Sequence, residues 1–234
     1  MALAGTAFLA LFNGFDPAHD DEYNVWHSVE HVPERLTMPG ITRARRYVNR
    51  EDADLPYFTL YELASIDAMY SDAYLRLLSH RSDWTNRMRP FFGKFFRAPC
   101  RTVFTRADGV GAAVQTIVLR STSARPPGRQ SWEALALALG RLPSLTGVHA
   151  GACDTAAPAV PGLQAPARAD AESMLVVIVE AQEEKWLVRH REAIDAAVRA
   201  LEGDWGEPEC RTYRLMHLID AGRTAEETAR LLGR

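Results

Sequence analysis

The stretch "MPGITRARRYV" (38–48) has a counterpart in the second half of the chain, "LPSLTGVHAGA" (142–152). Two more pairs follow in the same order: "YFTLYELAS" (57–65) with "MLVVIVEAQ" (174–182), and "APCRTVFTR" (98–106) with "PECRTYRLM" (208–216). Identity within each pair is low, so the shared order and type of segments carry the argument. A repeat of this kind indicates a duplicated structural unit.

Each half is expected to hold four strands and two helices. Alternating or continuous apolar runs predict strands over 6–14, 41–49, 56–63, 98–106, 112–121, 145–154, 173–181 and 209–219. The segment 19–32 is expected to be helical, and runs with Ser near their start or Gly at their end predict helices over 65–89, 129–142 and 183–203. The order β-α-β-β-α-β in each half is that of a ferredoxin-like unit.

The predicted fold class is therefore α+β, with two ferredoxin-like repeats in one chain forming an α/β barrel. The repeats are expected over 1–109 and 110–220, followed by a short C-terminal helix over 221–234. The open sheet faces of two such units are expected to press together. The Ala- and Pro-rich segment 155–172 is expected to be a long loop, either a surface insertion or a lid.

The composition is that of a soluble globular protein. The chain has 234 residues, of which 47% are hydrophobic and 24% charged, and its net charge of −3 gives no electrostatic footprint for nucleic acid. No apolar run approaches a membrane span, and the apolar start reads as a buried strand rather than a signal peptide. Three cysteines make no disulfide framework, so free thiols and a cytoplasmic location are expected.

The stretch "WHSVEHVPERLTMPG" (26–40) concentrates polar side chains in the first half. On an unbroken helix, His27, Glu30, His31 and Glu34 share one face. The opposite face is an apolar stripe of Val25, Val29, Val32 and Leu36. The simplest interpretation is that the polar face points to water.

Two observations favour a functional site instead. Pro33 lacks an N–H and disfavours helix before it, so we expect the helix to stop near His31 and "PERLTM" to restart as a separate turn. When Met38 is aligned on Leu142, His31 falls on Leu135 and the rest of the polar set on Ser, Ala or Leu. The duplicated architecture therefore does not require this polar set.

The first 105 residues resemble the dimeric α/β barrel superfamily and are most similar to its EthD-like members. The residues that carry the resemblance are Trp26, His27, Glu30, His31, Pro33, Glu34, Arg35, Pro39, Gly40, Arg43, Arg45 and Tyr47. The resemblance implies a ligand pocket between the sheet and its helices, and a possible homodimer. The superfamily includes cofactor-free cyclases, lyases and monooxygenases as well as haem enzymes, so the fold leaves the reaction open.

Several chemistries fit these residues. "HSVEH" (27–31) matches the zinc-peptidase motif H-x-x-E-H, but Pro33 follows two residues later and the expected fold does not suit such a site. A metal held by the two histidines with Glu30 or Glu34 is a second option. A haem would need an axial ligand from His149, His190 or His217. Acid/base catalysis without a cofactor is the leading interpretation, because a histidine takes and returns a proton near neutral pH.

We therefore predict an enzyme for a small-molecule substrate that is aromatic or carries a carbonyl group, of the lyase, isomerase or cyclase type, without metal or cofactor. The expected acid/base groups are His31, His27 and Glu30, with Arg35 orienting an anionic or carbonyl group. The expected substrate-binding residues are Tyr23, Trp26, Arg43, Tyr47 and Tyr61. The segment 79–96 is expected to cap the pocket or form a subunit interface. The alternatives are a haem- or cofactor-free monooxygenase and a ligand-binding module without turnover.

Overall fold

The computed structural model describes residues 3–123, 125–154, 156 and 173–223. Its strands lie where the sequence predicts them. They are β1 (Ala7–Phe15), β2 (Ile41–Val48), β3 (Tyr57–Leu63), β4 (Phe92–Ala107), β5 (Ala113–Ser121), β6 (Leu145–Cys153), β7 (Ser173–Ala181) and β8 (Glu209–Asp220). β4 is the longest of these and begins before its predicted start at residue 98. The predicted helix over 221–234 lies almost wholly outside the described residues, as does most of the segment 155–172.

The helices are more broken than predicted. They are α1 (Asp20–Trp26), α2 (Val32–Leu36), α3 (Asp72–Ser79), α4 (Asp83–Met88), α5 (Arg129–Leu139), α6 (Glu184–Arg189) and α7 (Arg191–Arg199). The single helix expected over 65–89 is wrong, because the hydroxyls of Ser71 and Ser82 each accept a backbone N–H three residues on and start new helices. The helix expected over 183–203 is interrupted at His190.

Hydrogen bonds join the eight strands in the closed order β1-β3-β2-β8-β5-β7-β6-β4. The predicted fold class, α+β with two ferredoxin-like repeats forming a barrel, is therefore confirmed. Both repeats have the same strand order: β4-β1-β3-β2 in the first and β8-β5-β7-β6 in the second. Within the described residues no helix is both long and apolar enough to cross a bilayer.

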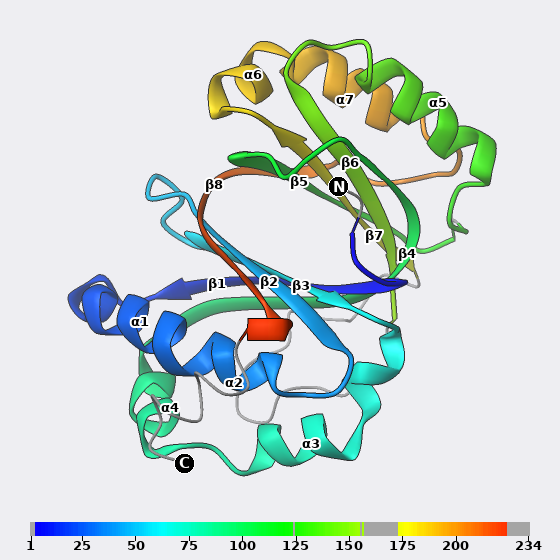
Figure 1. Cartoon of the computed structure of the whole chain (residues 1–234). Helices are drawn as coiled ribbons and strands as arrows, with labels where there is room; N and C mark the ends of the chain where they lie inside the picture. Colours follow the sequence, from blue (N-terminus) through cyan, green and yellow to red (C-terminus); the bar gives the residue numbers. More distant parts are fainter. Residues whose placement is uncertain (1–2, 124, 155, 157–172, 224–234) are drawn as a thin grey trace. The chain divides into compact units, whose positions relative to one another are not determined.

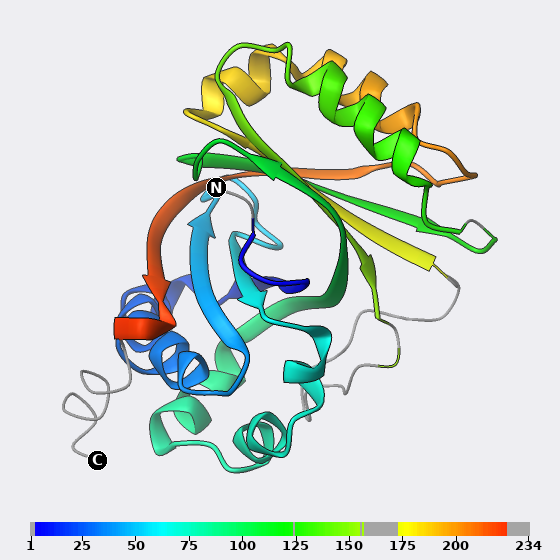
Figure 2. The ribbon, with the colours of Figure 1, turned by 45° about the vertical axis from the view of Figure 1, so that its right-hand side comes forward.

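The chain divides into two compact units. The N-terminal unit contains Ala4–Pro99 and the chain from Met216 onward. The C-terminal unit contains Cys100–Asp154 and the chain up to Leu215, together with the start of the chain. The division falls inside β4 and inside β8, so each of these strands contributes to both units. In the N-terminal unit α1 to α4 lie on one side of β1, β2 and β3 (Figures 1 and 2).

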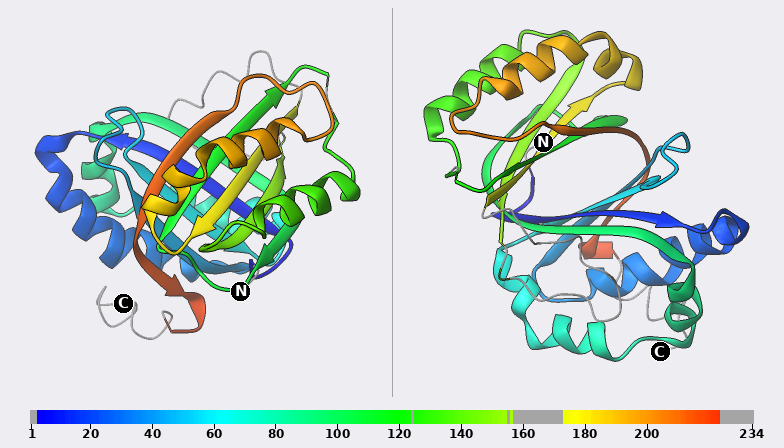
Figure 3. Two further views of the ribbon diagram at one scale, coloured as in Figure 1. Left: turned by 90° about the horizontal axis from the view of Figure 1, so that it is seen from above. Right: turned by 180° about the vertical axis from the view of Figure 1, so that it is seen from behind.

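In the C-terminal unit, α5 and α7 lie side by side across the sheet formed by β5, β6 and β7 (Figure 3). Large apolar side chains fill the layer between these helices and the sheet. They include Trp132, Leu135, Leu139, Leu187, Ile194 and Val198, all at most 2% exposed. In the alignment of the two repeats, Leu135 corresponds to His31 and Leu139 to Arg35.

The strand registers show how closely the repeats correspond. Leu63 on β3 pairs with Ala7 and Ile41, while Ala181 on β7 pairs with Ala113 and Leu145. Both second strands also carry a bulge directly after this pair. The sequence alignment of the third strands, which set 57 against 174, is therefore one residue out of register.

In this register Glu62 and Glu180 occupy the same position, and both carboxylates are fully buried. The Glu62 carboxylate accepts hydrogen bonds from the Nε of Arg45 at 2.8 Å and from the backbone N–H of Ala4 at 2.6 Å. Its Oε1 also lies 2.7 Å from the Nη2 of Arg45. A buried carboxylate is stable only when it is paired and hydrogen-bonded, and both conditions are met.

The Glu180 carboxylate repeats this arrangement with a different partner. It accepts the backbone N–H of Gly111 at 2.6 Å, and its Oε1 lies 2.8 Å from the Nε2 of His149. The Nδ1 of His149 lies 2.7 Å from the Oγ1 of Thr105. Each carboxylate thus ties the chain entering a repeat to the third strand of that repeat.

We predict that Glu62→Leu lowers the free energy of unfolding by about 3–5 kcal/mol, because it leaves the Arg45 guanidinium buried without its counter-ion. The double variant Glu62→Leu/Arg45→Leu should recover most of this loss. Urea denaturation of both variants checks this. Glu133→Gln, which removes an exposed helical ion pair, is the control and should cost less than about 0.5 kcal/mol. A double variant as unstable as the single one would contradict the prediction.

Candidate functional site

The segment His27–His31 forms a π-helical turn that joins α1 to α2 without interrupting the helical backbone. At the end of this turn the N–H of Val32 donates to the carbonyl oxygen of His27, five residues back. The expectation that Pro33 stops the helix near His31 is therefore wrong. A proline ring clashes with the carbonyl four residues before it, and a π turn displaces that carbonyl. Pro33 then lies in the first turn of α2, where no N–H is needed.

Two polar residues of the π turn, His27 and Glu30, face the protein interior. His27 is 2% exposed and Glu30 is 7% exposed, whereas Val25 is 53% exposed and Val29 is 38% exposed. The expected apolar stripe is therefore wrong for Val25 and Val29, although Val32 and Leu36 are buried as expected. The pattern of apolar residues alone predicts that the histidines face water, whereas in the structure they face the interior.

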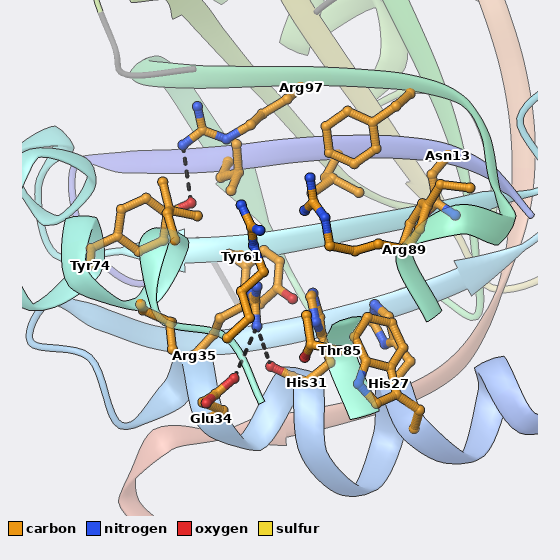
Figure 4. Close-up of a pocket in the computed structure, with 18 of the residues that line it drawn as sticks. Asn13, His27, His31, Glu34, Arg35, Tyr61, Tyr74, Thr85, Arg89 and Arg97 are labelled. Carbon is orange, nitrogen blue, oxygen red and sulfur yellow. Dashed lines mark hydrogen bonds and ion pairs between the residues drawn. The ribbon is translucent and has the colours of Figure 1, made fainter. Parts of the chain in front are cut away.

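A cavity lies within the N-terminal unit, between the sheet and the helices, where the superfamily resemblance places a ligand (Figure 4). Its lining comes from β1 to β4, from α1 to α4 and from the π turn between α1 and α2. The enclosed space measures about 60 Å³. This is room for a few water molecules. Two of the lining residues after α3, Arg81 and Arg89, are half-buried.

Six of the nine predicted site residues line this cavity: Tyr23, Trp26, His27, His31, Arg35 and Tyr61. The expected segment 79–96 also contributes, through Arg81, Thr85, Arg89, Phe92 and Phe95. That segment therefore caps the cavity, as predicted in one of its two alternatives. The remaining three predicted residues, Glu30, Arg43 and Tyr47, lie elsewhere.

The two histidines form a stacked pair. Their ring centroids are 5.0 Å apart, and the ring of Trp26 lies 4.3 Å from that of His31. The Nδ1 atoms of both histidines are buried without a hydrogen-bond partner among the described residues. Buried ring nitrogens of this kind are unusual, because unpaired polar atoms are costly to bury. They mark positions where a ligand atom would be stabilised.

Both histidines are held in the neutral form. Burial lowers the pKa of His27 well below its ordinary value, and the charge of Arg46 lowers it further. Burial and then the charges of Arg35 and Arg46 lower the pKa of His31 in the same way. A neutral imidazole can accept a proton, and it can also hold or donate a hydrogen bond.

Two tyrosines complete the polar lining near the histidines. Tyr61 comes from β3, and its buried hydroxyl has no hydrogen-bond partner among the described residues. Burial raises the pKa of Tyr61 far above its usual range, so it stays a hydroxyl donor. Tyr23 donates its hydroxyl to the Oδ1 of Asn13 at 3.0 Å, and burial raises its pKa to about 12.

Glu30, predicted to be an acid/base group together with the histidines, makes no hydrogen bond to either of them within the described residues. Its Oε1 instead accepts the indole N–H of Trp26 at 3.1 Å, the hydroxyl of Ser82 at 2.5 Å and the hydroxyl of Thr85 at 3.4 Å. The carboxylate thereby joins the π turn to α4. Glu30 orients the wall of the cavity rather than its contents.

Arg43 and Tyr47 lie on the sheet face that points away from the helices. Arg43 pairs across the strands with Glu62, and Tyr47 pairs with Phe58, whereas Tyr61 on the helix side pairs with Ala44. Arg43 also forms an ion pair with Asp220 at 2.5 Å. Alternation along β2 places Arg43, Arg45 and Tyr47 on one face, but alternation alone does not tell which face meets the helices.

Sequence reasoning missed Arg46, the residue whose charge lowers the pKa of His27 most. Arg46 is 1% exposed, and its guanidinium lies 4.8 Å from the ring centres of both Tyr23 and Tyr57. Such cation–π contacts stabilise a buried guanidinium. Arg46 stands in the run "RARRYVNR" (43–50), where alternation assigns it to the face opposite Arg45. That alternation was the available signal.

A haem does not fit this cavity. The enclosed space would have to grow from about 60 Å³ to several hundred Å³ to hold a ligand of this size, far more than one aromatic ring requires. The candidate axial ligands are also engaged elsewhere: both ring nitrogens of His149 face Glu180 and Thr105, and the Nε2 of His190 faces the carbonyl of Pro143 at 3.2 Å. His217 is half-buried on β8 near His27. Among the described residues, no group of three or more His, Cys, Asp or Glu side chains is arranged to hold a metal ion.

Comparison with known proteins shows the fold. No protein-family model matches the chain, and no curated protein matches it in sequence. Among solved structures, an anthrone oxidase-like protein aligns with a TM-score of 0.59 at 15% identity, over 93% of this chain and 94% of that one. A candidate monooxygenase from Lactobacillus acidophilus NCFM aligns at 0.54 with 7% identity, over 93% and 97% of the two chains.

A chlorite dismutase variant from Candidatus Nitrospira defluvii aligns with a TM-score of 0.51 at 11% identity, over 97% of this chain and 95% of that one. All three cover almost the whole of both chains, so the tandem arrangement is shared and not only one repeat. The broader resemblance, to α/β barrels of this kind, is confirmed. The narrower one, to EthD-like members, stays a prediction.

We predict that acid destabilises the protein through the buried histidines. Because the folded state keeps His27 and His31 neutral, the unfolded chain binds more protons as the pH falls below about 6.5. The free energy of unfolding should fall there by up to about 1.4 kcal/mol per pH unit for each histidine. His31→Gln should make this fall shallower. Urea denaturation between pH 7.5 and pH 5 measures it, with the exposed His80→Gln as control. Equal slopes for wild type and His31→Gln would contradict the prediction.

We predict that Pro33→Ala restores α-helical hydrogen bonding through residues 27–33 and rotates His31 away from the cavity. Its pKa should then rise toward the ordinary value near 6.5, because burial no longer disfavours the charged form. NMR titration of the histidine ring protons checks this, with the exposed Pro39→Ala as control. A pKa that stays low in Pro33→Ala would show that packing of the turn, rather than the proline, sets its geometry.

Proposed function

We propose that the chain is a cofactor-independent oxygenase that acts on an aromatic substrate with an acidic C–H or O–H group. The observation that carries this proposal is the convergence of three unpartnered polar atoms on one cavity: the Nδ1 of His27, the Nδ1 of His31 and the hydroxyl of Tyr61. The fold shared with an anthrone oxidase-like protein and a candidate monooxygenase supports oxygenase chemistry over the lyase, isomerase or cyclase types.

In this proposal His31 is the general base. It accepts a proton from the substrate and leaves a carbanion or phenolate. The hydroxyl of Tyr61 donates a hydrogen bond to the resulting oxyanion, and the guanidinium of Arg35 compensates its charge. Arg35 is placed for this because its Nη1 donates to the backbone carbonyl of His31 at 3.0 Å (Figure 4). His27 stacks on His31 and holds its ring in place.

Molecular oxygen is the co-reactant. For a CH₂ group between two rings, the substrate anion gives its electrons to O₂, one oxygen atom becomes the carbonyl oxygen of the product, and the other leaves as water with both hydrogens. The overall balance is R₂CH₂ + O₂ → R₂CO + H₂O. The proton held by His31 returns in the water that is released.

An aromatic substrate requires the cavity to enlarge. A cavity of about 150 Å³ is enough to hold one benzene ring, and the enclosed space is about 60 Å³. The side chains of Arg81 and Arg89 line the cavity and are half-buried, and their displacement would make room for a ring.

A ligand-binding module without turnover is the second candidate. The low pKa of both histidines favours it, because a weakly basic imidazole is a poor base for a weak acid. The two candidates share the cavity and differ in whether the bound molecule reacts.

Anthrone, with its acidic CH₂ between two rings, is the probe that separates the two candidates. We expect the wild-type protein to accelerate O₂ uptake and formation of the quinone product, followed with an oxygen electrode and by absorbance. His31→Ala should lower the rate by about 100-fold, the range for loss of a general base, and Tyr61→Phe by about tenfold. His80→Ala, on the surface, is the matched control. Binding of anthrone without oxygen uptake would favour the module, and wild-type rates in His31→Ala would overturn the assignment of the base.

A further inference from the structure

We infer that Cys100 and Cys153 form a redox-active pair, which a hydroperoxide converts reversibly into a disulfide that links β4 to β6. Both residues are thiols in the structure, and both belong to the C-terminal unit. The inference concerns a modification site that is separate from the cavity, and it does not depend on the proposed function. It departs from the expectation that all three cysteines remain thiols, which considered only their number and spacing.

The register of two neighbouring strands places the cysteines opposite each other. β4 and β6 are antiparallel, and Cys100 pairs directly with Cys153. Residues that pair in this way point to the same face of the sheet, and their Cα atoms lie about 4.5 or 5.5 Å apart, depending on whether they share hydrogen bonds. A disulfide requires a Cα separation of about 4.4–6.8 Å, so either kind of pair allows the bond. Because Cys153 is the last residue of β6, the bond fastens the end of this strand pair.

The two side chains are already in contact. Burial raises the pKa of the Cys100 thiol well above its ordinary value, and a side-chain hydrogen bond to Cys153 and the charge of Asp154 raise it further. The hydrogen bond shows that the two sulfur atoms lie close together. The carboxylate of Asp154 accepts a hydrogen bond from the Nη2 of Arg101 at 3.2 Å, which holds the chain beside the pair. Formation of the disulfide therefore needs little movement of the backbone.

The two thiols differ in their access to solvent. Cys100 is fully buried, whereas Cys153 is partly exposed. A cysteine reacts as its thiolate, and the raised pKa of Cys100 disfavours this form, so Cys100 is protected from direct oxidation. Cys153 is therefore the thiol that meets the oxidant, and Cys100 is the thiol that completes the disulfide.

The reaction has two steps. The sulfur of Cys153 attacks the O–O bond of a hydroperoxide ROOH, which leaves a sulfenic acid on Cys153 and releases ROH. The sulfur of Cys100 then attacks the sulfur of Cys153, the S–O bond breaks, and the oxygen leaves as water. The overall balance is two thiols + ROOH → disulfide + ROH + H₂O, so the cysteines are oxidised and the peroxide is reduced. A dithiol reductant reverses the change by thiol–disulfide exchange.

Cys210 supplies a control within the same unit. It lies exposed on β8, and the residue that pairs with it on β5 is Ile117. An oxidant can therefore reach Cys210, but the strand register gives this cysteine no second thiol on β5. The pair and the control differ in what lies across the strands, which is the feature on which the inference depends.

Treatment of the reduced protein with equimolar hydrogen peroxide tests the inference, followed by alkylation in denaturant and mass spectrometry. In the wild type we expect a linked pair of peptides that contain Cys100 and Cys153, the loss of two hydrogen atoms, and full reversal by dithiothreitol. Cys100→Ser should leave Cys153 as a sulfenic acid, which dimedone traps. Cys153→Ser should slow the oxidation of Cys100 at least tenfold. Cys210→Ser should keep the full yield of the linked peptides.

Thermal melting of each variant verifies folding, and the wild-type peptide map needs no substitution, so it decides the matter even where a variant fails to fold. Alkylation of both Cys100 and Cys153 after peroxide treatment would overturn the inference. A disulfide that involves Cys210, or one that forms only between two copies of the chain, would also overturn it. Equal rates of Cys100 oxidation in the wild type and in Cys153→Ser would overturn the order of the two steps.

Discussion

Pro33 lacks a backbone N–H, and this constrains the hydrogen bonding of the helical turn before it. With Pro33 in the helical segment, the backbone between His27 and Val32 adopts a π turn, in which hydrogen bonds reach five residues back. This turn directs His27 and His31 into the cavity, leaves Val25 and Val29 exposed, and lets the Nη1 of Arg35 donate to the backbone carbonyl of His31. The positions of the polar side chains that this helix contributes to the cavity therefore depend on the π turn.

The duplicated fold shows what the same layer looks like without that constraint. In the C-terminal unit α5 is a regular helix, and Leu135 and Leu139 pack into a continuous apolar core. In the N-terminal unit the aligned positions hold His31 and Arg35, and the layer contains a cavity. Burying polar groups without partners costs free energy, so the N-terminal unit carries a cost that its duplicate avoids. The buried carboxylates Glu62 and Glu180, which are common to both repeats, belong to the framework rather than to the site.

The fold could be predicted from the sequence because it depends on the order of strands and helices, and the same order occurs in both halves of the chain. The site could be predicted only in part. His27, His31 and Arg35 were identified because the second repeat lacks them, which is a comparison that needs no structure. Arg46 was missed because a basic residue in an alternating strand reads as a surface residue, and burial between two tyrosine rings is a property of the assembled sheet and helix.

Glu30 shows a second limit of the sequence. Its spacing from the histidines is right for a dyad, yet its carboxylate turns to Trp26, Ser82 and Thr85. Residues 82 and 85 lie more than fifty positions away, so no local pattern reveals that they compete for the same oxygen. Spacing along a helix fixes which side chains are neighbours, and tertiary partners decide which neighbours interact.

The electrostatics of the cavity join the histidines to the arginines. In the absence of an anion, burial and the positive charges of Arg35 and Arg46 keep His31 neutral and weakly basic. A negative charge that develops on a bound molecule beside His31 favours the protonated imidazole and raises the pKa of His31. In the proposed reaction the base would therefore be weakest in the empty cavity and stronger as an oxyanion forms. The same positive charges that weaken the base in the empty cavity would stabilise that oxyanion.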